Sequence, residues 1–451
     1  MLNPIAPGFT RLPKTRTRLP TIRSGVISLI ALWLAVLLLS CPANLAQAGT
    51  LSEHILTARS YPGSRDRQYK VYVPDNLPNP APLVMVLHGC AQTHEDVLRD
   101  WGMQAAADRY HFILVAPYVT SWDLWDGIRG DNCWGFWLPQ HRQAGRGEPE
   151  DLYQIALEVE RGHPVDPQKR YVTGLSSGGA MSVILTVTHN DYWAAAAPAA
   201  GLPYGEDAKA VSALGTCPGW AWFHSLPRVV SDMRAQLGAS AYPLPLLVIQ
   251  NTQDCTVLQP AGANLRDAQL ALYADPAHRT PNKAWIEEVA CAPVFQEDYG
   301  CRHSRYSRDG QSGGPSLVET LSYQGPHLTP SHEDRDLGHY WVGGVEGQEG
   351  PYAVRRGPSY PDIIWDFFER HRRGDAGQVN FDDQPLSCVS RTYSPWNHLN
   401  AGRGFLSTLG GQVLSSGDRK SIGFSWDWWS KVTLHEGASG LWYTETPARC
   451  R

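Results

Sequence analysis

The sequence predicts an α/β fold, in which buried parallel strands alternate with helices that cover the sheet. Apolar runs such as Ala81–Gly89 and Phe112–Tyr118 are typical of strands buried on both faces of a parallel sheet. Amphipathic segments with helical spacing lie between such runs, as at Glu150–His163. Strands that alternate with helices in this order are joined by right-handed crossovers.

The other elements follow from the local pattern. Arg67–Leu77 alternates like a strand as far as Pro74, and Val97–Tyr110 has the apolar spacing of a helix. Pro361–Arg373 begins with proline and closes with basic residues, as a terminal helix does. Outside its one strand, the irregular polar stretch Gln259–Asp336 is expected to form loops over a site. Further strands are expected at Arg170–Ser176, Leu244–Asn251 and Ser316–Tyr323.

Residues 1–48 have the features of a secretory signal peptide. Basic residues precede the apolar run Gly25–Ser40, and Ala46–Ala48 fits the small-x-small cleavage pattern, so we expect export and cleavage after Ala48. A membrane anchor is one alternative, although the run is short for a membrane span. Lipid attachment at Cys41 is another, which the following Pro42 disfavours.

Composition narrows the function. The net charge of −5 arises from 39 basic and 44 acidic residues without a basic stripe, so no nucleic-acid partner is expected. The nine cysteines leave an even set once Cys41 is set aside, which predicts disulfides in an exported chain. No CxxC pair or HExxH stretch suggests a zinc site. The 17 tryptophans fit either a core or a surface that holds sugars or polymers.

The chain is expected to contain a catalytic α/β domain at residues 49–373, a polar linker at 374–385 and a small C-terminal β-rich module at 386–451. The module has aromatic runs separated by glycine turns. Cys388 and Cys450 are expected to close it with a disulfide.

The stretch Gly174–Gly178, "GLSSG", fits the G-x-S-x-G pattern of a nucleophile elbow. A strand precedes it and the helical segment "GGAMSVILTVTH" follows it, which is the context that the motif needs. Glycines two residues before and after Ser176 leave room for the chain in a sharp turn. The pattern therefore predicts Ser176 as a nucleophile, whereas the alternative is a flexible loop of small residues.

An elbow serine needs an acid and a base that follow it in the order Asp or Glu, then His. Asp254 comes just after the strand Leu244–Asn251, where an orienting carboxylate belongs. For the base, position in the chain alone hardly distinguishes His339 in "LGHYWVGG" from His327 in "SYQGPHL", and His332 is a weaker candidate.

Five ordered motifs, "LHGCAQ", "CWGFW", "GRGEPEDL", "YVTGLSSGGAM" and "GHYWVGG", together resemble the secreted polyhydroxybutyrate depolymerase esterase family, which is similar to feruloyl and acetylxylan esterases. The resemblance covers roughly Tyr61–Arg373 and implies an α/β-hydrolase fold with His339 as the base. The chain departs from the family pattern at Val342, where proline is usual, and at Gln250–Asn251, where His-Gly is common. Extra residues also lie between Tyr323 and Gly338.

The elbow, the even number of cysteines and the family motifs together predict the surroundings of the serine. The backbone N–H groups of Cys90 and Ser177 are expected to form the oxyanion hole, and His88 to brace the loop before it. Trp134 and Trp341, in two of the motifs, are expected to contact substrate. A disulfide between Cys90 and Cys133 is expected to fix the loops at one wall of the pocket. The alternatives are a bridge from Cys90 to Cys255 beside the acid, and two free buried thiols. The other expected pairs are Cys217 with Cys255, Cys291 with Cys301 and Cys388 with Cys450.

The expected function is hydrolysis of carboxylic esters through an acyl-serine intermediate, with no cofactor or metal. The substrate implied by the resemblance is a polyester such as poly(3-hydroxybutyrate). The alternatives are a carbohydrate esterase that releases ferulate or acetate, and a non-catalytic protein that binds a polymer with its tryptophans. We expect a secreted protein, extracellular or periplasmic, with no stable membrane insertion. The tail His398–Gly404, "HLNAGRG", resembles a short C-terminal module of some family members.

The signal peptide yields a first prediction. The exported protein should begin at or near Gly49 and carry no lipid, because cleavage after Ala48 removes Cys41 together with the apolar run. Amino-terminal sequencing of the exported protein checks the first residue. A diacylglyceryl group on Cys41 would contradict the prediction.

Overall fold

The structure is a computed structural model that describes residues 49–119, 132–212, 216–273, 286–307, 316–327, 337–384, 386–407, 410–437 and 440–450. The expected signal peptide, including Cys41, lies outside the described residues, and so does His332.

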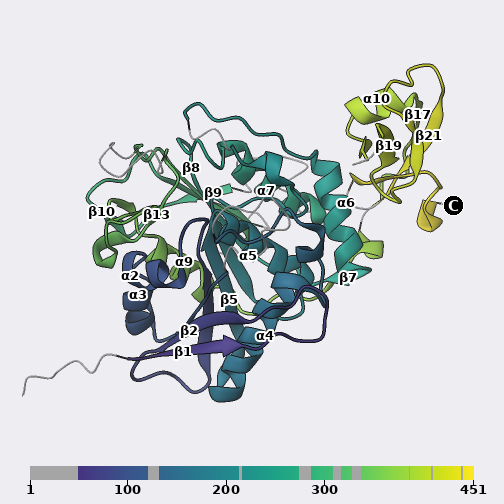
Figure 1. Cartoon of the computed structure of the whole chain (residues 1–451). Coiled ribbons are helices and arrows are strands. Elements are labelled where there is room, and N and C mark those ends of the chain that lie inside the picture. Colours follow the sequence, from purple (N-terminus) through teal and green to yellow (C-terminus); the bar gives the residue numbers. More distant parts are fainter. Residues whose placement is uncertain are drawn as a thin grey trace, which may run out of the picture. The chain divides into compact units, whose positions relative to one another are not determined.

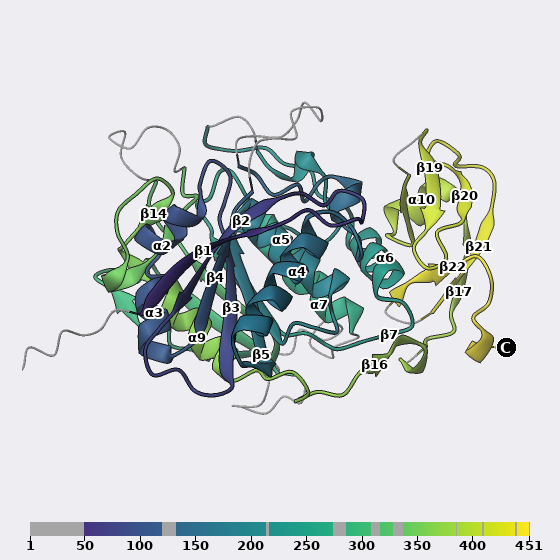
Figure 2. The same ribbon diagram turned by 60° about the horizontal axis from the view of Figure 1, so that its bottom comes forward.

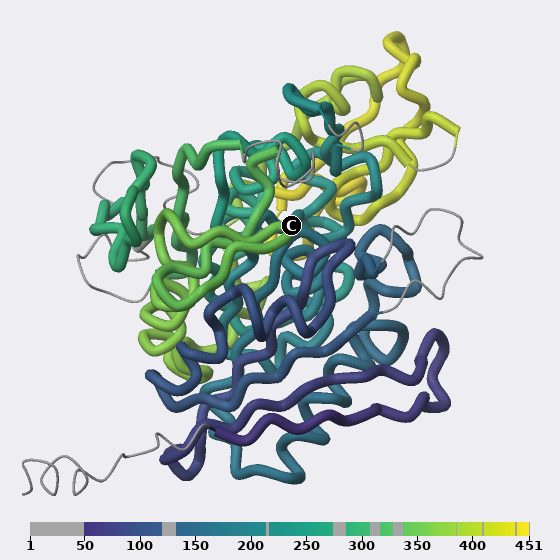
Figure 3. Tube along the Cα trace, turned by 60° about the vertical axis from the view of Figure 1, so that its left-hand side comes forward, coloured from purple at the N-terminus to yellow at the C-terminus, as the bar shows by residue number. Residues whose placement is uncertain are grey.

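A ten-stranded sheet forms the centre of the catalytic part, with the strand order β1-β2-β4-β3-β5-β6-β8-β12-β11-β9 (Figure 1). The antiparallel hairpin of β1 and β2 lies at one edge of this sheet (Figure 3). The strands are β1 (Thr50–Leu56), β2 (Arg67–Val73), β3 (Ala81–Leu87), β4 (Ile113–Pro117), β5 (Val165–Leu175), β6 (Ala195–Ala199), β8 (Leu246–Asn251), β9 (Ile286–Val289), β11 (Arg302–Ser307) and β12 (Ser316–Tyr323).

Neighbouring strands from β4 to β12 in this order are parallel, and this arrangement gathers the site. Their registers align the carboxyl ends: Leu87 of β3 is opposite Gly174 of β5, and Asn251 of β8 is opposite Tyr323 of β12. Every residue of β3, β4, β6 and β8 is buried, because helices cover both faces of the sheet. The loops that follow β3, β5, β8 and β12 therefore meet at one edge, where ligands bind in open α/β sheets.

Helices lie in two groups on either side of the sheet, with α2, α3 and α9 in one group and α4 to α7 in the other (Figures 1 and 2). Helix α5 is buried along its whole length between the sheet and its neighbours, and its few polar side chains, such as Ser182 and Thr186, donate hydrogen bonds to the helix backbone. The helices of this domain are α2 (His94–Asp100), α3 (Met103–Tyr110), α4 (Gly147–Gly162), α5 (Ser177–Thr188), α6 (Leu226–Leu237), α7 (Gln259–Leu272) and α9 (Tyr360–Glu369).

The single helix expected at Val97–Tyr110 is in fact two helices, α2 and α3. The break falls at Gly102, which has a left-handed backbone with φ of 71°. A Cβ at this position would lie 2.6 Å from the carbonyl oxygen of Gly343, so only glycine fits against the "GHYWVGG" segment. The apolar spacing continues across the break, and for this reason the pattern alone does not reveal it.

The loops expected over Gln259–Asp336 are also corrected by the structure. The helix α7 begins at Gln259 with a proline in its first turn, and it packs against β8 and β12. Strands β9, β11 and β12 then extend the sheet as an antiparallel meander. Polar side chains of this meander partly pair with one another, as His303 and Glu319 do at 2.7 Å. The buried Glu319 also pairs at 2.7 Å with the partly exposed Arg370 at the end of α9. The polarity of the segment therefore partly reflects ion pairs between strands β11 and β12 and helix α9.

The acidic motif "GEPED" fastens the start of α4 to its surroundings. Asp151 has no exposed surface and accepts hydrogen bonds from the Tyr61 hydroxyl at 2.6 Å, the Ser64 hydroxyl at 2.7 Å and the Arg67 Nε at 2.6 Å. Glu148, also fully buried, accepts the Gly135 N–H at 2.7 Å. These two carboxylates join the helix to β2 and to the "CWGFW" loop.

Short strand pairs complete the catalytic part. The expected linker packs against this part of the chain. Phe381 is fully buried, and the Cζ of Arg234 lies 4.1 Å from the centroid of the Phe381 ring in a cation–π contact. The pairs are β7 (Ser240–Ala241) with β16 (Val379–Asn380), β10 (Val294–Phe295) with β15 (Gly357–Pro358), and β13 (Trp341–Val342) with β14 (Ala353–Val354).

Residues 386–450 form two three-stranded sheets and the helix α10 (Pro395–Asn400) around a small core of Val413, Ile422 and Leu434. The disulfide between Cys388 and Cys450 joins the ends of this module. In "HLNAGRG", the buried His398 contacts the Val432 carbonyl oxygen at 2.9 Å and accepts the Arg403 Nε at 2.8 Å, so the motif braces the module. The strands are β17 (Ser390–Tyr393), β18 (Gly404–Leu406), β19 (Gln412–Ser415), β20 (Ser421–Phe424), β21 (Val432–Glu436) and β22 (Trp442–Tyr443).

The buried pair of Asp151 and Arg67 gives a prediction on stability. The substitution Asp151→Asn should lower the free energy of unfolding by about 3–5 kcal/mol, because it leaves the buried guanidinium without a counter-charge. The matched control is Glu288→Gln, which breaks an exposed pair with Arg302 and should change the same quantity by less than about 1 kcal/mol. Urea unfolding of both variants measures the difference. Equal effects would contradict the prediction.

Candidate active site

Ser176 lies at the sharp turn between β5 and α5. Its backbone has φ of 58° and ψ of −119°, a strained conformation for a residue with a side chain. Its N–H donates to the Ala199 carbonyl oxygen at 3.0 Å, and its carbonyl oxygen accepts the Ala180 N–H at 2.8 Å. The turn therefore presents the hydroxyl at the carboxyl edge of the sheet, and 8% of the residue is exposed.

The two glycines of the motif are required by close backbone packing. A Cβ on Gly178 would lie 2.1 Å from the Leu87 carbonyl oxygen, and one on Gly174 would lie 2.5 Å from the same atom. Neither distance allows a side chain. The start of α5 can therefore pass directly over the end of β3 only because both positions are glycine. Gly89, two residues after β3, also lies beside the serine, because a Cβ on it would be 3.4 Å from the Cβ of Ser176.

The structure brings Asp254 and His339 together. The Nδ1 of His339 lies 2.7 Å from the Oδ2 of Asp254, and 95% or more of each residue is buried, with exposures of 5% and 4%. The other oxygen of Asp254 accepts the N–H groups of Thr256 and Val257, both at 2.8 Å. The carboxylate can donate no proton, so the Nδ1 carries one and the Nε2 of the imidazole is left as a base.

The rival histidine has a different environment. His327 is exposed, and its Nε2 lies 2.9 Å from the Gln253 carbonyl oxygen rather than near a carboxylate. The same nitrogen lies 3.6 and 3.8 Å from the sulfurs of Cys217 and Cys255, which are joined in a disulfide. The geometry therefore favours His339 as the partner of Asp254.

Asn251, which stands where family members commonly have glycine, joins the acid loop to the base loop. Its Nδ2 donates to the Gly338 carbonyl oxygen at 2.8 Å, next to His339, and to the Gly325 carbonyl oxygen at 3.2 Å. Its Oδ1 accepts the Gly325 N–H at 2.9 Å and the Gln253 N–H at 3.1 Å. Sequence reasoning missed this role, because a single polar residue at the end of a strand matches no recognisable motif.

The loop after β3 is fixed by a buried histidine and a disulfide. His88 has no exposed surface, and its Nε2 accepts the Val119 N–H at 3.2 Å while its Nδ1 contacts the Gly89 carbonyl oxygen at 2.8 Å. Burial lowers the pKa of His88 to about 4, so it braces the loop as a neutral ring. The structure pairs Cys90 with Cys133, at a Cα–Cα distance of 4.2 Å.

The two tryptophans expected to contact substrate are buried instead. The ring of Trp134 packs against His88, and its Nε1 donates to the His88 carbonyl oxygen at 3.0 Å. The ring of Trp341 stacks on Trp101 with centroids 4.2 Å apart, and its Nε1 donates to the Trp101 carbonyl oxygen at 3.0 Å. Both side chains are 0% exposed, so they support the loops of the site and offer no surface to a substrate.

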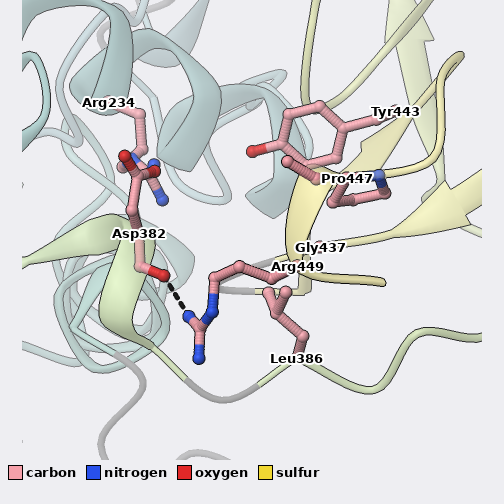
Figure 4. Close-up of a pocket in the computed structure, with 8 residues that line it drawn as sticks. Arg234, Asp382, Leu386, Gly437, Tyr443, Pro447 and Arg449 are labelled. Carbon is pink, nitrogen blue, oxygen red and sulfur yellow. Dashed lines mark hydrogen bonds between the residues drawn. The ribbon is translucent and has the colours of Figure 1, made fainter. Parts of the chain in front are cut away.

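One further pocket lies away from Ser176, Asp254 and His339. A surface pocket is lined by Arg234, Asp382, Tyr443, Arg449 and their neighbours, and Arg449 donates to the carbonyl oxygen of Asp382 (Figure 4). None of the expected site residues lines it. Among the helices of the described residues, none is long and apolar enough to cross a membrane.

The sheet order, the elbow and the buried acid–base pair define the class of α/β-hydrolases that act through a serine. Comparison with known families agrees, because residues 67–273 match the model of the family described as "Esterase PHB depolymerase". The chain belongs to this family of polyhydroxybutyrate depolymerase esterases and is a carboxylic ester hydrolase.

Individual relatives have related names. The chain is 31% identical over 65% of its length to poly(3-hydroxyalkanoate) depolymerase C of Paucimonas lemoignei, covering 66% of that protein. It is 25% identical over 80% of its length to poly(3-hydroxybutyrate) depolymerase of Ralstonia pickettii, covering 71% of it. Among solved structures, an acetyl xylan esterase from Aspergillus awamori matches 71% of this chain and 99% of its own, with 18% identity and a TM-score of 0.49.

Asn251 yields a prediction on activity. The substitution Asn251→Ala should lower kcat/KM for p-nitrophenyl butyrate about 10- to 100-fold, because the acid and base loops lose their common anchor and small displacements are costly. The control is Asn190→Ala, since Asn190 also bonds to two segments, at Thr186 and Tyr242, but belongs to no site loop. The control should lose stability and keep its activity. Equal activity losses in the two variants would contradict a positioning role.

Proposed function

We propose that this protein is an exported esterase that cleaves an aliphatic polyester through an acyl-serine intermediate, with Ser176 as nucleophile, His339 as base and Asp254 as orienting acid. The observation that carries the proposal is the 2.7 Å contact of His339 with Asp254 at the same sheet edge as the strained elbow of Ser176. The three side chains come from the loops after β8 and β12 and from the turn after β5.

The acylation step begins when the Oγ of Ser176 attacks the ester carbonyl carbon and its proton passes to the Nε2 of His339. Asp254 stabilises the imidazolium that forms, and its second oxygen stays bound to backbone N–H groups. The tetrahedral intermediate collapses, and His339 returns the proton to the leaving alkoxide as the alcohol departs. Water then attacks the acyl-serine by the same route and releases the acid.

The negative oxygen of each intermediate is assigned to the N–H groups of Ser177 and Cys90. Ser177 is the first residue of α5, whose N-terminus carries a partial positive charge. Cys90 is held by its disulfide to Cys133, and Gly89 before it lies against Ser176. Preorganised donors of this kind cost no reorganisation during the reaction.

The polyester substrate is supported by the two depolymerase relatives and by the family match. Export is supported by four disulfides in the described residues, because such bonds persist in oxidising compartments. We assign residues 1–48 to the signal peptide, 49–373 to the catalytic domain, 374–385 to the segment that joins the parts and 386–451 to the C-terminal module.

The triad gives a prediction on catalysis. Ser176→Ala and His339→Ala should each lower kcat on p-nitrophenyl butyrate on the order of 10⁴-fold, and Asp254→Asn somewhat less, because they remove the nucleophile, the base and its orientation. The control is His327→Ala, which should stay within about threefold of the parent. If His327→Ala were inactive and His339→Ala active, the assignment of His339 as the base would be overturned.

The substrate is tested by comparing poly(3-hydroxybutyrate) granules with acetylated xylan and feruloylated arabinoxylan. The parent enzyme should clear the granules, and the Ser176→Ala variant should not. Release of acetate or ferulate without any clearing of granules would make the protein a carbohydrate esterase.

A further inference from the structure

Two tryptophans of the catalytic domain, separated by one alanine in the sequence, are exposed. Trp220 and Trp222 are 65% and 66% exposed, whereas Trp101, Trp134 and Trp341 have no exposed surface. Each exposed indole leaves a large apolar area in contact with water. Two exposed indoles on one short segment indicate a contact surface more strongly than one indole alone. The segment 216–225 that carries them, here called the tryptophan loop, has neither helix nor strand.

The backbone of the tryptophan loop is firmly held. The Trp220 N–H donates to the Ser212 hydroxyl at 3.0 Å, and the Trp222 N–H donates to the Lys209 carbonyl oxygen at 2.8 Å. The N–H of His224 donates to both oxygens of the buried Glu206, at 3.0 and 3.1 Å. The two indoles are therefore presented from a fixed backbone, which reduces the entropy lost when a partner binds.

The tryptophan loop lies against the loop of the catalytic acid. Cys217 is joined by a disulfide to Cys255, the residue directly after Asp254. A Cβ on Gly219 would lie 2.1 Å from the Cys255 carbonyl oxygen, so the two backbones pass in close contact. The Ser212 N–H also donates to the Thr256 carbonyl oxygen at 2.9 Å. The backbone of the tryptophan loop therefore adjoins the loop of Asp254 at this edge of the sheet.

The chemistry of the tryptophan loop selects the kind of partner. Residues 216–223, "TCPGWAWF", carry no charged side chain, so this segment itself offers no group that would pair with an ionic polymer. Uncharged rings bury apolar area efficiently against methylene and methyl groups, which an aliphatic polyester offers along its whole length. A soluble short-chain ester, in contrast, needs only the space around Ser176.

We propose that Trp220 and Trp222 bind the surface of an insoluble aliphatic polyester and hold a chain of it at the catalytic edge. This inference rests on the proposed function, because it concerns the polymer that the same site cleaves. The disulfide from Cys217 to Cys255 couples the contact to the acid loop, so that a chain lying on the indoles is held beside Asp254 and its partners.

The experiment uses the exported full-length protein and the double variant Trp220→Ala/Trp222→Ala. The measured quantity is the ratio of the rate on poly(3-hydroxybutyrate) granules to the rate on p-nitrophenyl butyrate. This ratio should fall about 10-fold or more, because aromatic side chains that become buried on binding contribute most of the affinity of a contact surface. The Trp220→Phe/Trp222→Phe variant, which keeps two rings, should stay within about threefold of the parent.

The matched control is Ile55→Ala, since Ile55 is 61% exposed on the edge strand β1, six positions from β8 in the sheet order. The control should leave the ratio unchanged, and all variants should keep the parent Tm because the altered side chains are exposed. Adsorption to granules, measured in a Ser176→Ala background, should weaken in the alanine double variant in parallel with the ratio.

The outcomes separate the inference from the proposed function. If the parent clears granules and the alanine double variant keeps the parent ratio, the role of the indoles is overturned and the polyester function stands. If the double variant loses activity on acetylated xylan and not on granules, the indoles bind sugar and the inference is overturned. If the parent does not clear granules, the proposed polyester function fails and the inference fails with it.

Discussion

The close approach of three backbones around Ser176 is the constraint on which the site depends. The end of β3, the end of β5 and the start of α5 pass each other at distances that exclude a Cβ at Gly174 and Gly178. The positive φ of Ser176 can persist only because this packing and the hydrogen bond to Ala199 over-determine it. The same packing sets the first turn of α5 and the loop after β3 beside Ser176, so the proposed nucleophile and the proposed oxyanion donors are held together.

The second half of the site is held by different means. The acid and base loops follow neighbouring parallel strands, and the amide of Asn251 bonds to both. Disulfides brace the site on two sides, one at Cys90 beside the oxyanion loop and one at Cys255 beside the acid. Such bonds persist in oxidising compartments, where they hold loops that little apolar packing covers.

The tryptophans divide into two sets with different physical roles. One set is fully buried and stacks or donates hydrogen bonds to the loops that carry the site, as Trp134 and Trp341 do. The other set is exposed, on the tryptophan loop and in the C-terminal module, where Trp396, Trp426 and Trp428 line one shallow hollow. Sequence position in an aromatic motif does not distinguish the sets, because burial depends on what packs over the ring.

The sequence by itself determined the α/β order, the elbow at Ser176 and the position of Asp254, because buried strands, glycine spacing and strand ends are local features of the chain. Sequence position did not distinguish His339 from His327 as the base, because several strands and loops separate both from the serine. The fold brings His339 into contact with Asp254, whereas His327 contacts the backbone carbonyl oxygen of Gln253. The break at Gly102, the strands β9 and β11 and the burial of Trp134 were likewise decided by tertiary contacts. Each depends on a partner distant in sequence, such as Gly343 or His88, whose approach no local pattern encodes.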